Sequence, residues 1–559
     1  MTAAALVDPT VEATIQVTLV GSELDNPPVV SGYAHHWPTP RRRHGRRKAM
    51  LRWALISGVL FVSLVLAVAV TPALALVPAF VVLGAWALVA LPFGLLTPMV
   101  VGILLSTNAP GLHPSEDRWR SPLYSVGKIL YTVMPIKLAV ADILIGALVV
   151  RAVMVIVLND WGAGRDRRPP RPFAQAALVG LGAILTWTVI GIGTGGSFKN
   201  MLWQVRPLMW MPCFAIAASV AAATRQGIAR FRTAILVAGV VKAVEGIYFY
   251  FGVAKPRHLD VAYVTTHSDS VLWAVATAIV VADWVEERNH RTRRNMVLLI
   301  PFYALGMVLN NRRTVWVSVF AGVAFIAAVA QQPVKRQLAR ILGVTWPLLI
   351  LYVAIGLGTH SPSIVFKPVS MIDSVLFQTD ASSSTRDIEN YNLLVTLKAR
   401  PFLGWGFGHE YIEASKAYDI SKGFAQYRYI PHNSFLGLWA FLGPVGAGGY
   451  FLLPVVAVFY AVGTRRRTRD PLLRSAGAWA VCTVIAYLVQ GWADIGLQDW
   501  TAIVCVGVGF GISGALPRHV RREVDRELDG EVGTEGGLLV DPTLARGRFP
   551  SDSPHASLG

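Results

Sequence analysis

Charged residues and cysteines are both scarce in this sequence. Asp, Glu, Lys and Arg make up only 15% of its 559 residues, against 54% apolar residues, whereas charged residues are about a quarter of a soluble domain. The three cysteines, Cys213, Cys482 and Cys505, each lie inside an apolar run, so no disulfide framework or zinc site is indicated. The composition predicts an all-α polytopic membrane protein.

The net charge of +18 would indicate a nucleic-acid partner in a soluble protein. Here the arginine clusters stand between hydrophobic runs, and no nucleic-acid-binding motif accompanies them. We therefore interpret the clusters as signals of membrane topology. The predicted partner is a lipid bilayer, with no nucleic acid.

About 12–14 apolar runs are long enough to cross a bilayer, whose core needs roughly 20 residues per helix. Pro72, Pro78 and Pro92 make the first three runs hard to separate. The predicted organisation is a disordered cytoplasmic tail (1–50), a transmembrane bundle (51–358), a large external loop (359–433), C-terminal transmembrane helices (434–516) and a second disordered cytoplasmic tail (517–559).

The basic clusters orient these spans, because positively charged loops stay in the cytoplasm. With the N-terminus inside, every strong cluster falls on the cytoplasmic side, namely 165–171, 225–232, 286–295, 333–340, 464–469 and 518–523. We therefore predict a multi-pass protein of the cell membrane with both termini in the cytoplasm. The same alternation places the 359–433 loop outside.

External arginines oppose this charge bias and need another explanation. Arg312 and Arg313, in "LNNRRTVWVSV", stand at a tight external turn, and Arg206 precedes a span on the same side. An arginine fork binds phosphate oxygens in a bidentate manner and does not lose its charge, which suits a diphosphate at a lipid interface. The alternative is that these side chains reach toward lipid headgroups.

The external loop contains a predicted helix along the membrane surface. Ser384 and Asp387 have the spacing of a capping box, and Pro401 stops the helix. Apolar residues follow at helical spacing: Ile388, Tyr391, Leu394 and Val395. Arg386 would stand in the first turn, where a cation opposes the helix dipole, and an anionic partner would explain it: either a ligand or a salt bridge to Asp387 or Glu389.

Three glycines in "GWGFG", Gly404, Gly406 and Gly408, have some likeness to a dinucleotide-binding fingerprint. No strand precedes them and no βαβ unit surrounds them, so that function is not indicated. We interpret them as a tight backbone path for the loop.

His432 and Asn433 open the span that follows the loop. A histidine is the side chain best suited to accept a proton near neutral pH, although a lone interfacial histidine is more often structural. Asn433 could orient the imidazole, cap the helix or bind a sugar hydroxyl. His267, outside and near the start of another span, is a candidate for the acceptor side of a site.

Taken in order, "NNRRT", "SSSTR", "ARPFLGWGFG" and "PHNSFLGLWAFLGPVGAGG" resemble the C-terminal domain of the O-antigen ligase and O-antigen polymerase superfamily over residues 300–460. The resemblance implies a metal-independent membrane glycosyltransferase of the GT-C type, without a cofactor, that uses a polyprenyl-diphosphate-linked glycan on the external leaflet. It also implies that His432 is the general base and that Arg312 or Arg313, together with Arg386, holds the diphosphate. The acceptor would be a glycan or a glycolipid, and no residue separates ligase from polymerase.

The alternative is a membrane transporter or flippase of lipid-linked oligosaccharides. Such a protein often has repeated halves and polar residues near the bilayer midplane. This sequence shows no internal repeat, and its polar residues are concentrated in one external loop. The pattern therefore favours an enzyme acting at the membrane surface.

Overall fold

The computed structural model describes residues 58, 62, 77–107, 139–158, 167–259, 261, 263–266, 268–359, 363–376, 381–416 and 427–534. The chain divides into two units, 1–84 and 85–559, and the second contains every feature considered below. The first tail, most of the first predicted span and His267 lie outside the described residues, as do residues 535–559.

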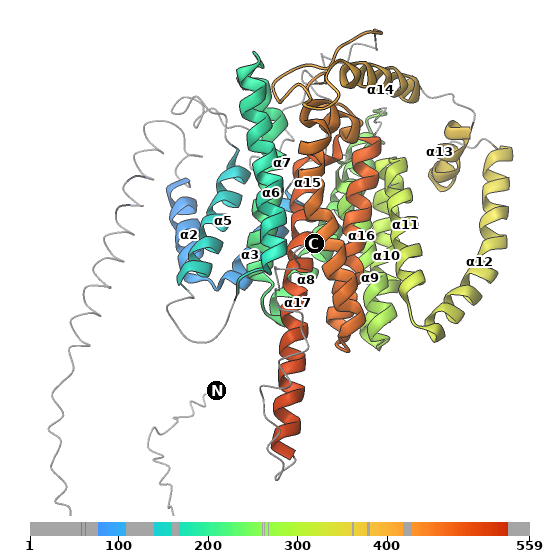
Figure 1. The fold of residues 1–559 in the computed structure, drawn as a ribbon. Coiled ribbons are helices and arrows are strands. Elements are labelled where there is room, and N and C mark those ends of the chain that lie inside the picture. The colour runs from blue at the N-terminus through green and yellow to red at the C-terminus, as the bar shows by residue number, and fades with distance from the viewer. Residues whose placement is uncertain are drawn as a thin grey trace, which may run out of the picture. The chain divides into compact units, whose positions relative to one another are not determined.

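The described residues are helical and contain no strand, which confirms the predicted all-α class. The helices, labelled as in Figure 1, are α2 (Val77–Ala90), α3 (Phe93–Ser106), α5 (Val140–Leu158), α6 (Arg171–Gly193), α7 (Phe198–Ala221), α8 (Arg225–Tyr248), η4 (Phe249–Ala254), α9 (Asp269–Glu287), α10 (His290–Asn310), α11 (Arg313–Val329), α12 (Gln332–Thr359), η5 (Ile364–Phe366), α13 (Lys367–Leu376), α14 (Ala381–Ala399), α15 (Ser434–Arg467), α16 (Pro471–Ala493), η6 (Ile495–Gln498) and α17 (Trp500–Thr534).

Seven of these helices are long and apolar enough to cross a membrane: α5, α6, α8 with η4, α12, α15, α16 and α17. The predicted count of 12–14 also includes helices that are shorter or more polar, such as α3, α7, α9, α10 and α11, which pack against the seven. A polytopic membrane protein is therefore the correct class.

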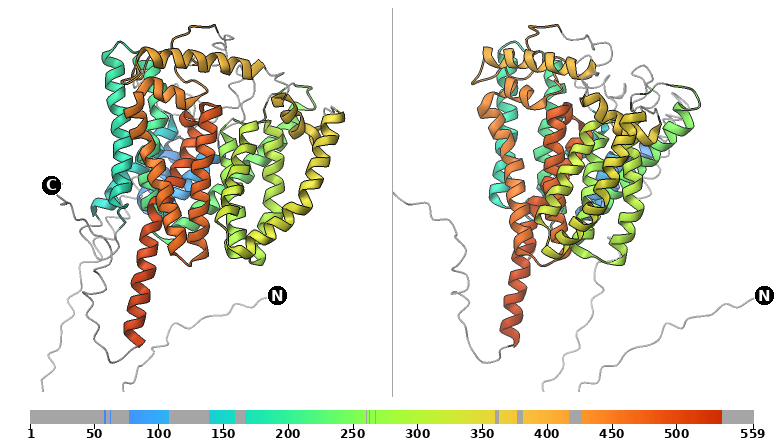
Figure 2. Two further views of the ribbon diagram at one scale, coloured as in Figure 1. Left: turned by 45° about the vertical axis from the view of Figure 1, so that its right-hand side comes forward. Right: turned by 90° about the vertical axis from the view of Figure 1, so that its right-hand side faces the viewer.

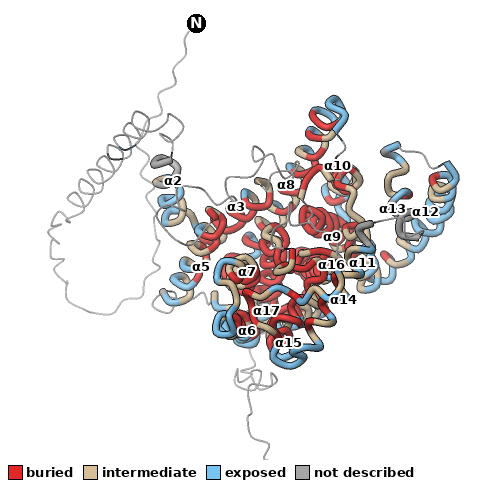
Figure 3. The backbone as a smooth tube through the Cα atoms, turned by 90° about the horizontal axis from the view of Figure 1, so that it is seen from above, coloured by how far each residue is buried: buried red, intermediate tan, exposed pale blue. Residues whose placement is uncertain are grey.

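The centre and the periphery of the bundle differ in burial. In the most apolar stretch of α17, 89% of the residues are buried, whereas in that of α12 only 6% are buried. Seen along the bundle, α17, α16 and α9 have their buried residues at the centre, and α12 stands at the edge with mostly exposed residues (Figure 3). An apolar helix with so little protein around it fits a lipid environment.

The bundle has two ends with different chemistry. We call the end that carries α14 the α14 end; α14 lies across it, above the ends of the bundle helices (Figures 1 and 2). We call the opposite end, formed by the links 222–224, 288–289, 330–331 and 468–470, the basic end.

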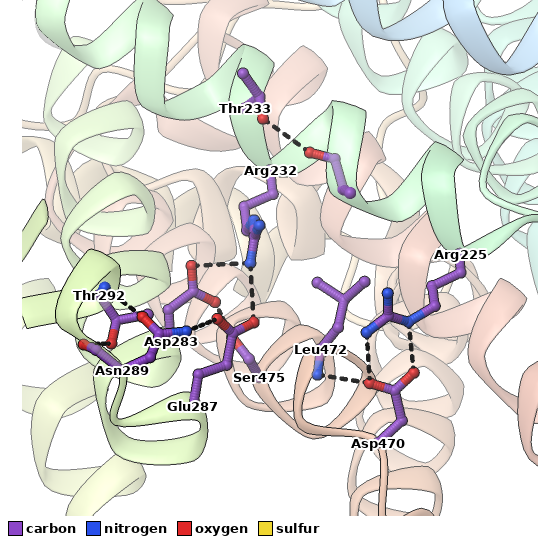
Figure 4. Close-up of polar contacts among 11 residues, drawn as sticks. Arg225, Arg232, Thr233, Asp283, Glu287, Asn289, Thr292, Asp470, Leu472 and Ser475 are labelled. Atoms are coloured by element: carbon purple, nitrogen blue, oxygen red, sulfur yellow. Dashed lines mark hydrogen bonds and ion pairs between the residues drawn. The ribbon is translucent and has the colours of Figure 1, made fainter.

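Ion pairs between helices fasten the basic end. Arg225 of α8 binds Asp470 with two hydrogen bonds of 2.7 and 3.2 Å, and Arg232 binds Asp283 and Glu287 of α9 at 3.2 and 3.4 Å (Figure 4). Each of these arginines therefore has a carboxylate of the same chain as its partner.

Helix α17 continues to Thr534, past residue 516, where the sequence analysis ended the last span. Arg518 donates hydrogen bonds to the carbonyls of Arg168 and Ser219, and Arg522 donates to the carbonyl of Ala223. These contacts hold the start of the extension against the α7–α8 link, so it does not leave the bundle as a free tail.

A glycine-rich segment fastens the large loop to the α14 end. Gly404 and Gly406 have positive φ angles of 67° and 75°. A Cβ atom on Gly406 would lie 2.4 Å from the backbone of Gly191 in α6, so no larger residue fits there. The amide of Gly406 donates to the carbonyl of Phe441 at 2.8 Å, which agrees with the predicted tight backbone path.

Helix α14 is confirmed, but its start and its buried face differ from the prediction. It begins at Ala381, so Ser384 lies inside the helix and does not cap it, and Arg386 stands in the second turn. Its buried residues are Glu389, Asn392, Leu393 and Thr396, whereas Tyr391 and Leu394 are exposed. The polar side chains face inward because they bind the rest of the loop, as Asn392 does with both backbone groups of Ser415.

Candidate active site

His432 stands directly before α15 and is held by one carboxylate. The Nδ1 atom of His432 lies 3.0 Å from Oε2 of Glu389, and its backbone amide donates to Oε1 of the same residue at 3.2 Å. Since an ionised carboxylate only accepts hydrogen bonds, Nδ1 carries the proton. Among the described residues Nε2 has no hydrogen-bond partner, which makes it the nitrogen available to accept a proton.

The environment of His432 shifts its pKa in two directions. Burial disfavours the charged imidazolium and lowers the pKa, but the hydrogen bond and charge of Glu389 and the charge of Asp494 outweigh it, so the pKa of His432 is raised. Arg386 opposes this rise. The Glu389 side chain is only 5% exposed, whereas that of His432 is 23% exposed. Solvent or a substrate therefore reaches the histidine more easily than its carboxylate partner.

Arg386 is positioned by the same helix as Glu389. The two residues are three apart on α14, so they share one face. Of the two alternatives for Arg386, the salt bridge to Asp387 or Glu389 does not form, and among the described residues Arg386 has no ion pair. The structure therefore keeps a guanidinium close to His432 while the nearest buried carboxylate is engaged with the imidazole.

Arg312 reaches the same site from the α10–α11 turn. This turn has only two residues, of which Asn311 is left-handed and Arg312 is the N-terminal flank of α11. The guanidinium of Arg312 lies 4.5 Å from the ring centroid of Tyr263. Burial lowers the pKa of Arg312, the charges of Asp494 and Tyr263 oppose this effect, and Arg386 adds to it. Two like charges, Arg312 and Arg386, are thus near enough to repel each other.

Asp494 connects the elements of the site. It follows α16, caps the amide of Ile495 at 2.9 Å, and its backbone carbonyl accepts a hydrogen bond from the Ser434 hydroxyl at 3.1 Å. The last turn of α16 is in turn tied to α11, because the Thr314 hydroxyl donates to Oε1 of Gln490 at 3.0 Å. The charge of Asp494 consequently acts on both His432 and Arg312.

A comparison with known protein families identifies this region. Residues 296–451 match the family model described as O-antigen ligase. This stretch is therefore similar to the O-antigen ligase family. No curated protein matches the chain. The matched segment contains Arg312, Arg313, Arg386 and His432, and it also contains Glu389. The family supports a role for this membrane protein in polysaccharide assembly.

The remaining candidates, in the matched segment and around it, have separate positions. Arg313 begins α11 directly after Arg312. Asn433 caps α15, since its side-chain oxygen accepts from the amide of Leu436 at 3.2 Å. Of the three interpretations considered for Asn433, the structure shows the helix cap.

Arg206 contacts residues of two other helices. The helix that contains it, α7, begins at Phe198, so Arg206 lies inside the helix and not before it as predicted. Its Nε atom lies 3.3 Å from Oδ1 of Asp142 in α5, and its guanidinium lies 5.3 Å from the ring centroid of Trp500. Arg206 therefore forms an ion pair between α7 and α5. This pair explains the arginine at this position without a phosphate ligand.

Sequence reasoning missed Glu389 and Asp494 as members of the site. Glu389 was considered only as a partner of Arg386, although its spacing from Arg386 on one helix face was a usable signal. Asp494 stands at the end of an apolar helix, which is also unusual in a membrane protein. In the described part of the chain, no group of three or more His, Cys, Asp or Glu side chains is placed to hold a metal ion.

Proposed function

We propose that the chain is a glycosyltransferase that moves a glycan from a polyprenyl-diphosphate donor onto an acceptor hydroxyl at the external face of the membrane. One observation carries the proposal. The buried carboxylate of Glu389 holds His432 by its backbone and its ring, while Arg386 beside it has no ion-pair partner among the described residues. A base and a cation available to ligand thus stand together at one membrane face.

The first part of the reaction is removal of the acceptor proton. Nε2 of His432 accepts the proton of the acceptor hydroxyl as its oxygen forms a bond to the anomeric carbon of the donor sugar. Glu389 keeps the proton on Nδ1 and stabilises the imidazolium that forms. The raised pKa of His432 strengthens it as a base.

The second part is departure of the diphosphate. The bond between the anomeric carbon and the diphosphate oxygen breaks, and its electron pair leaves with the diphosphate. Arg386 and Arg312, or Arg313 in place of Arg312, hold the negative charge that develops, and a well-placed donor of this kind contributes about 3 kcal/mol. Because the hydroxyl attacks from the face opposite the leaving group, the configuration at the anomeric carbon inverts.

Several features of the proposal come from the sequence and the family. The basic clusters at the basic end indicate the cytoplasmic side, so the α14 end is the external one and both termini are cytoplasmic. Following the family resemblance, the mechanism includes no metal ion and no cofactor. A ligase and a polymerase would share these steps and differ in the acceptor, which is a glycan or a glycolipid.

Substitution of the base tests the proposal. In proteoliposomes supplied with a polyprenyl-diphosphate-linked glycan and an acceptor, we expect His432→Ala to lower the transfer rate by about 1,000-fold, within the usual range for loss of a general base. The matched control is His409→Ala, at the same end, whose imidazole bonds Thr194 and the Gly191 carbonyl. Wild-type turnover in a folded His432→Ala variant would eliminate the general-base role.

A further inference from the structure

A cavity of about 380 Å³ lies at the basic end, beside the α7–α8 link. It is enclosed by the start of α3, the second half of α5, the segment before α6 and the α7–α8 link. Three of its lining residues are arginines, Arg151, Arg167 and Arg230. Since a water molecule occupies about 30 Å³, the cavity has the volume of about a dozen waters, which is enough for a phosphodiester headgroup.

The three arginines have no carboxylate partner among the described residues. Arg151 donates to the carbonyls of Leu88 and Leu91, at the end of α2, and Arg230 donates to the carbonyl of Gly94 at 3.3 Å. These acceptors are neutral, so the three positive charges are solvated but not neutralised. Arginine keeps its charge in such a site, and an anion in the cavity would reduce the mutual repulsion.

Two further arginines, both from the extension of α17, bind backbone carbonyls at or beside the cavity lining. Arg518 donates to the carbonyl of Arg168, next to Arg167, and Arg522 donates to the carbonyl of Ala223, which lines the cavity. The extension of α17 thus packs beside the cavity lining. Arg225, in the same α7–α8 region, is paired with Asp470. That carboxylate binds Arg225 and not an arginine of the cavity.

Helix α5, which contributes to the cavity lining, also has an exposed apolar face. Next to Arg151 and Val155, which line the cavity, α5 exposes an apolar row on its outer face: Val150, Val153, Met154 and Val157. A ligand with a charged head in the cavity could therefore lay its hydrocarbon chains along α5. Basic cavities between transmembrane helices are known to suit anionic lipid headgroups, and the arginine fork matches phosphate oxygens.

We propose that this cavity binds the phosphate group of an anionic phospholipid from the adjoining leaflet. The site is separate from the His432 site and does not depend on the function proposed for it. The same phosphate chemistry could be supplied by soluble phosphate, so the experiment includes both sources.

Lipid retention by the full-length protein tests the site. The purified chain is equilibrated in detergent with phosphatidylglycerol or phosphatidylcholine, and the lipid that stays bound is counted by native mass spectrometry. We expect the wild-type protein to retain phosphatidylglycerol at least tenfold better than phosphatidylcholine. The double variant Arg167→Gln/Arg230→Gln should lose most of this preference. The matched control, Arg293→Gln/Arg294→Gln, removes two exposed arginines of the same end and should keep it.

Two results would overturn the proposal. The first is equal retention of both lipids by the wild-type protein, which overturns the proposal whether or not the double variant folds. The second is a folded double variant that prefers phosphatidylglycerol as strongly as the wild type does. A separate measurement adds inorganic phosphate during thermal unfolding. Phosphate that raises the unfolding temperature of the wild type but not of the double variant, without any lipid preference, would assign the cavity to soluble phosphate instead.

Discussion

Arg232 and Arg386, at opposite ends of the bundle, differ in what their nearby carboxylates bind. At the basic end, Arg232 binds Asp283 at 3.2 Å. At the α14 end, Arg386 has Glu389 three residues away on its own helix, yet Glu389 binds His432 at 3.0 Å. An arginine with a carboxylate close to it therefore forms an ion pair at one end, whereas at the other end the carboxylate binds a histidine instead.

Paired arginines of this kind stabilise the fold, whereas an arginine without an ion pair is available to bind a ligand. An ion pair between helices fixes their register, and its loss leaves the partner charge buried. A cation that is kept near a second cation, as Arg386 is near Arg312, is unfavourable until an anion arrives. Natural proteins depart from local rules of this kind mainly at functional sites.

The largest effect on stability should come from breaking a buried pair of the basic end. The Glu286 side chain, 5% exposed, binds Arg465 and also Arg474, whose Nε atom is 2.6 Å away. We expect Glu286→Gln to lower the free energy of unfolding by about 3 kcal/mol, because two guanidinium groups lose their carboxylate. Thermal unfolding in detergent measures this change, and the transfer rate of the folded fraction should stay at the wild-type level.

The neighbouring glutamate provides the control for that variant. Glu287 is 23% exposed and lies 3.4 Å from Arg232, which also binds Asp283. Glu287→Gln should therefore cost less than 1 kcal/mol. Equal unfolding temperatures for Glu286→Gln and the wild type would show that the pairing at this end does not stabilise the bundle.

Sequence patterns predicted the features that are determined by residues close together in the chain. Apolar runs gave the helices, the Asn-Arg turn gave the tight α10–α11 link, and Pro401 follows the end of α14 at Ala399. The residues proposed for the site, Arg312, Arg386 and His432, came from exceptions to charge bias and polarity. Each of these signals lies within one or two turns of helix, where physical constraints are local.

The sequence did not show which side chains would pair across the fold. Glu389 and His432 are 43 residues apart. The sequence around Glu389 does not indicate that its carboxylate binds the histidine and not Arg386. The polar buried face of α14 was missed for the same reason, because its partners are in the segment 411–416. Arg206 was considered as a possible supporting residue because its partner, Asp142, belongs to another helix and is not evident from the nearby sequence.

A pair of matched arginine substitutions tests the contrast between the ends most directly. We expect Arg386→Gln to lower kcat/KM for the diphosphate donor about 100-fold, close to 2.7 kcal/mol, since it removes a donor to the departing charge. Arg225→Gln, at the basic end, breaks a pair in which Arg225 is 65% exposed, and should leave kcat/KM unchanged. Equal losses of kcat/KM in the two folded variants would remove the distinction between the ends.

Glu389→Gln should have the smallest effect on rate and the most specific signature. The amide can still accept from Nδ1 through its oxygen but carries no charge, so we expect the maximal rate to fall about tenfold. The hydrogen bond and charge of Glu389 raise the pKa of His432 against the effect of burial. In the variant this pKa should be lower, and the acidic limb of the rate profile should move to lower pH.

The pH dependence of stability tests the Glu389–His432 pair independently of the reaction rate, and its direction can be predicted. Because the pKa of His432 is raised in the folded protein, protonation stabilises the fold fully below the unfolded pKa, and this contribution is lost as pH rises through the folded pKa. The difference in unfolding temperature between the wild type and Glu389→Gln should therefore shrink as pH rises. Glu410→Gln, whose carboxylate pairs with Arg428 and is 44% exposed, is the control. If Glu389→Gln moves neither the acidic limb nor this difference, Glu389 only supports the loop and does not position the base.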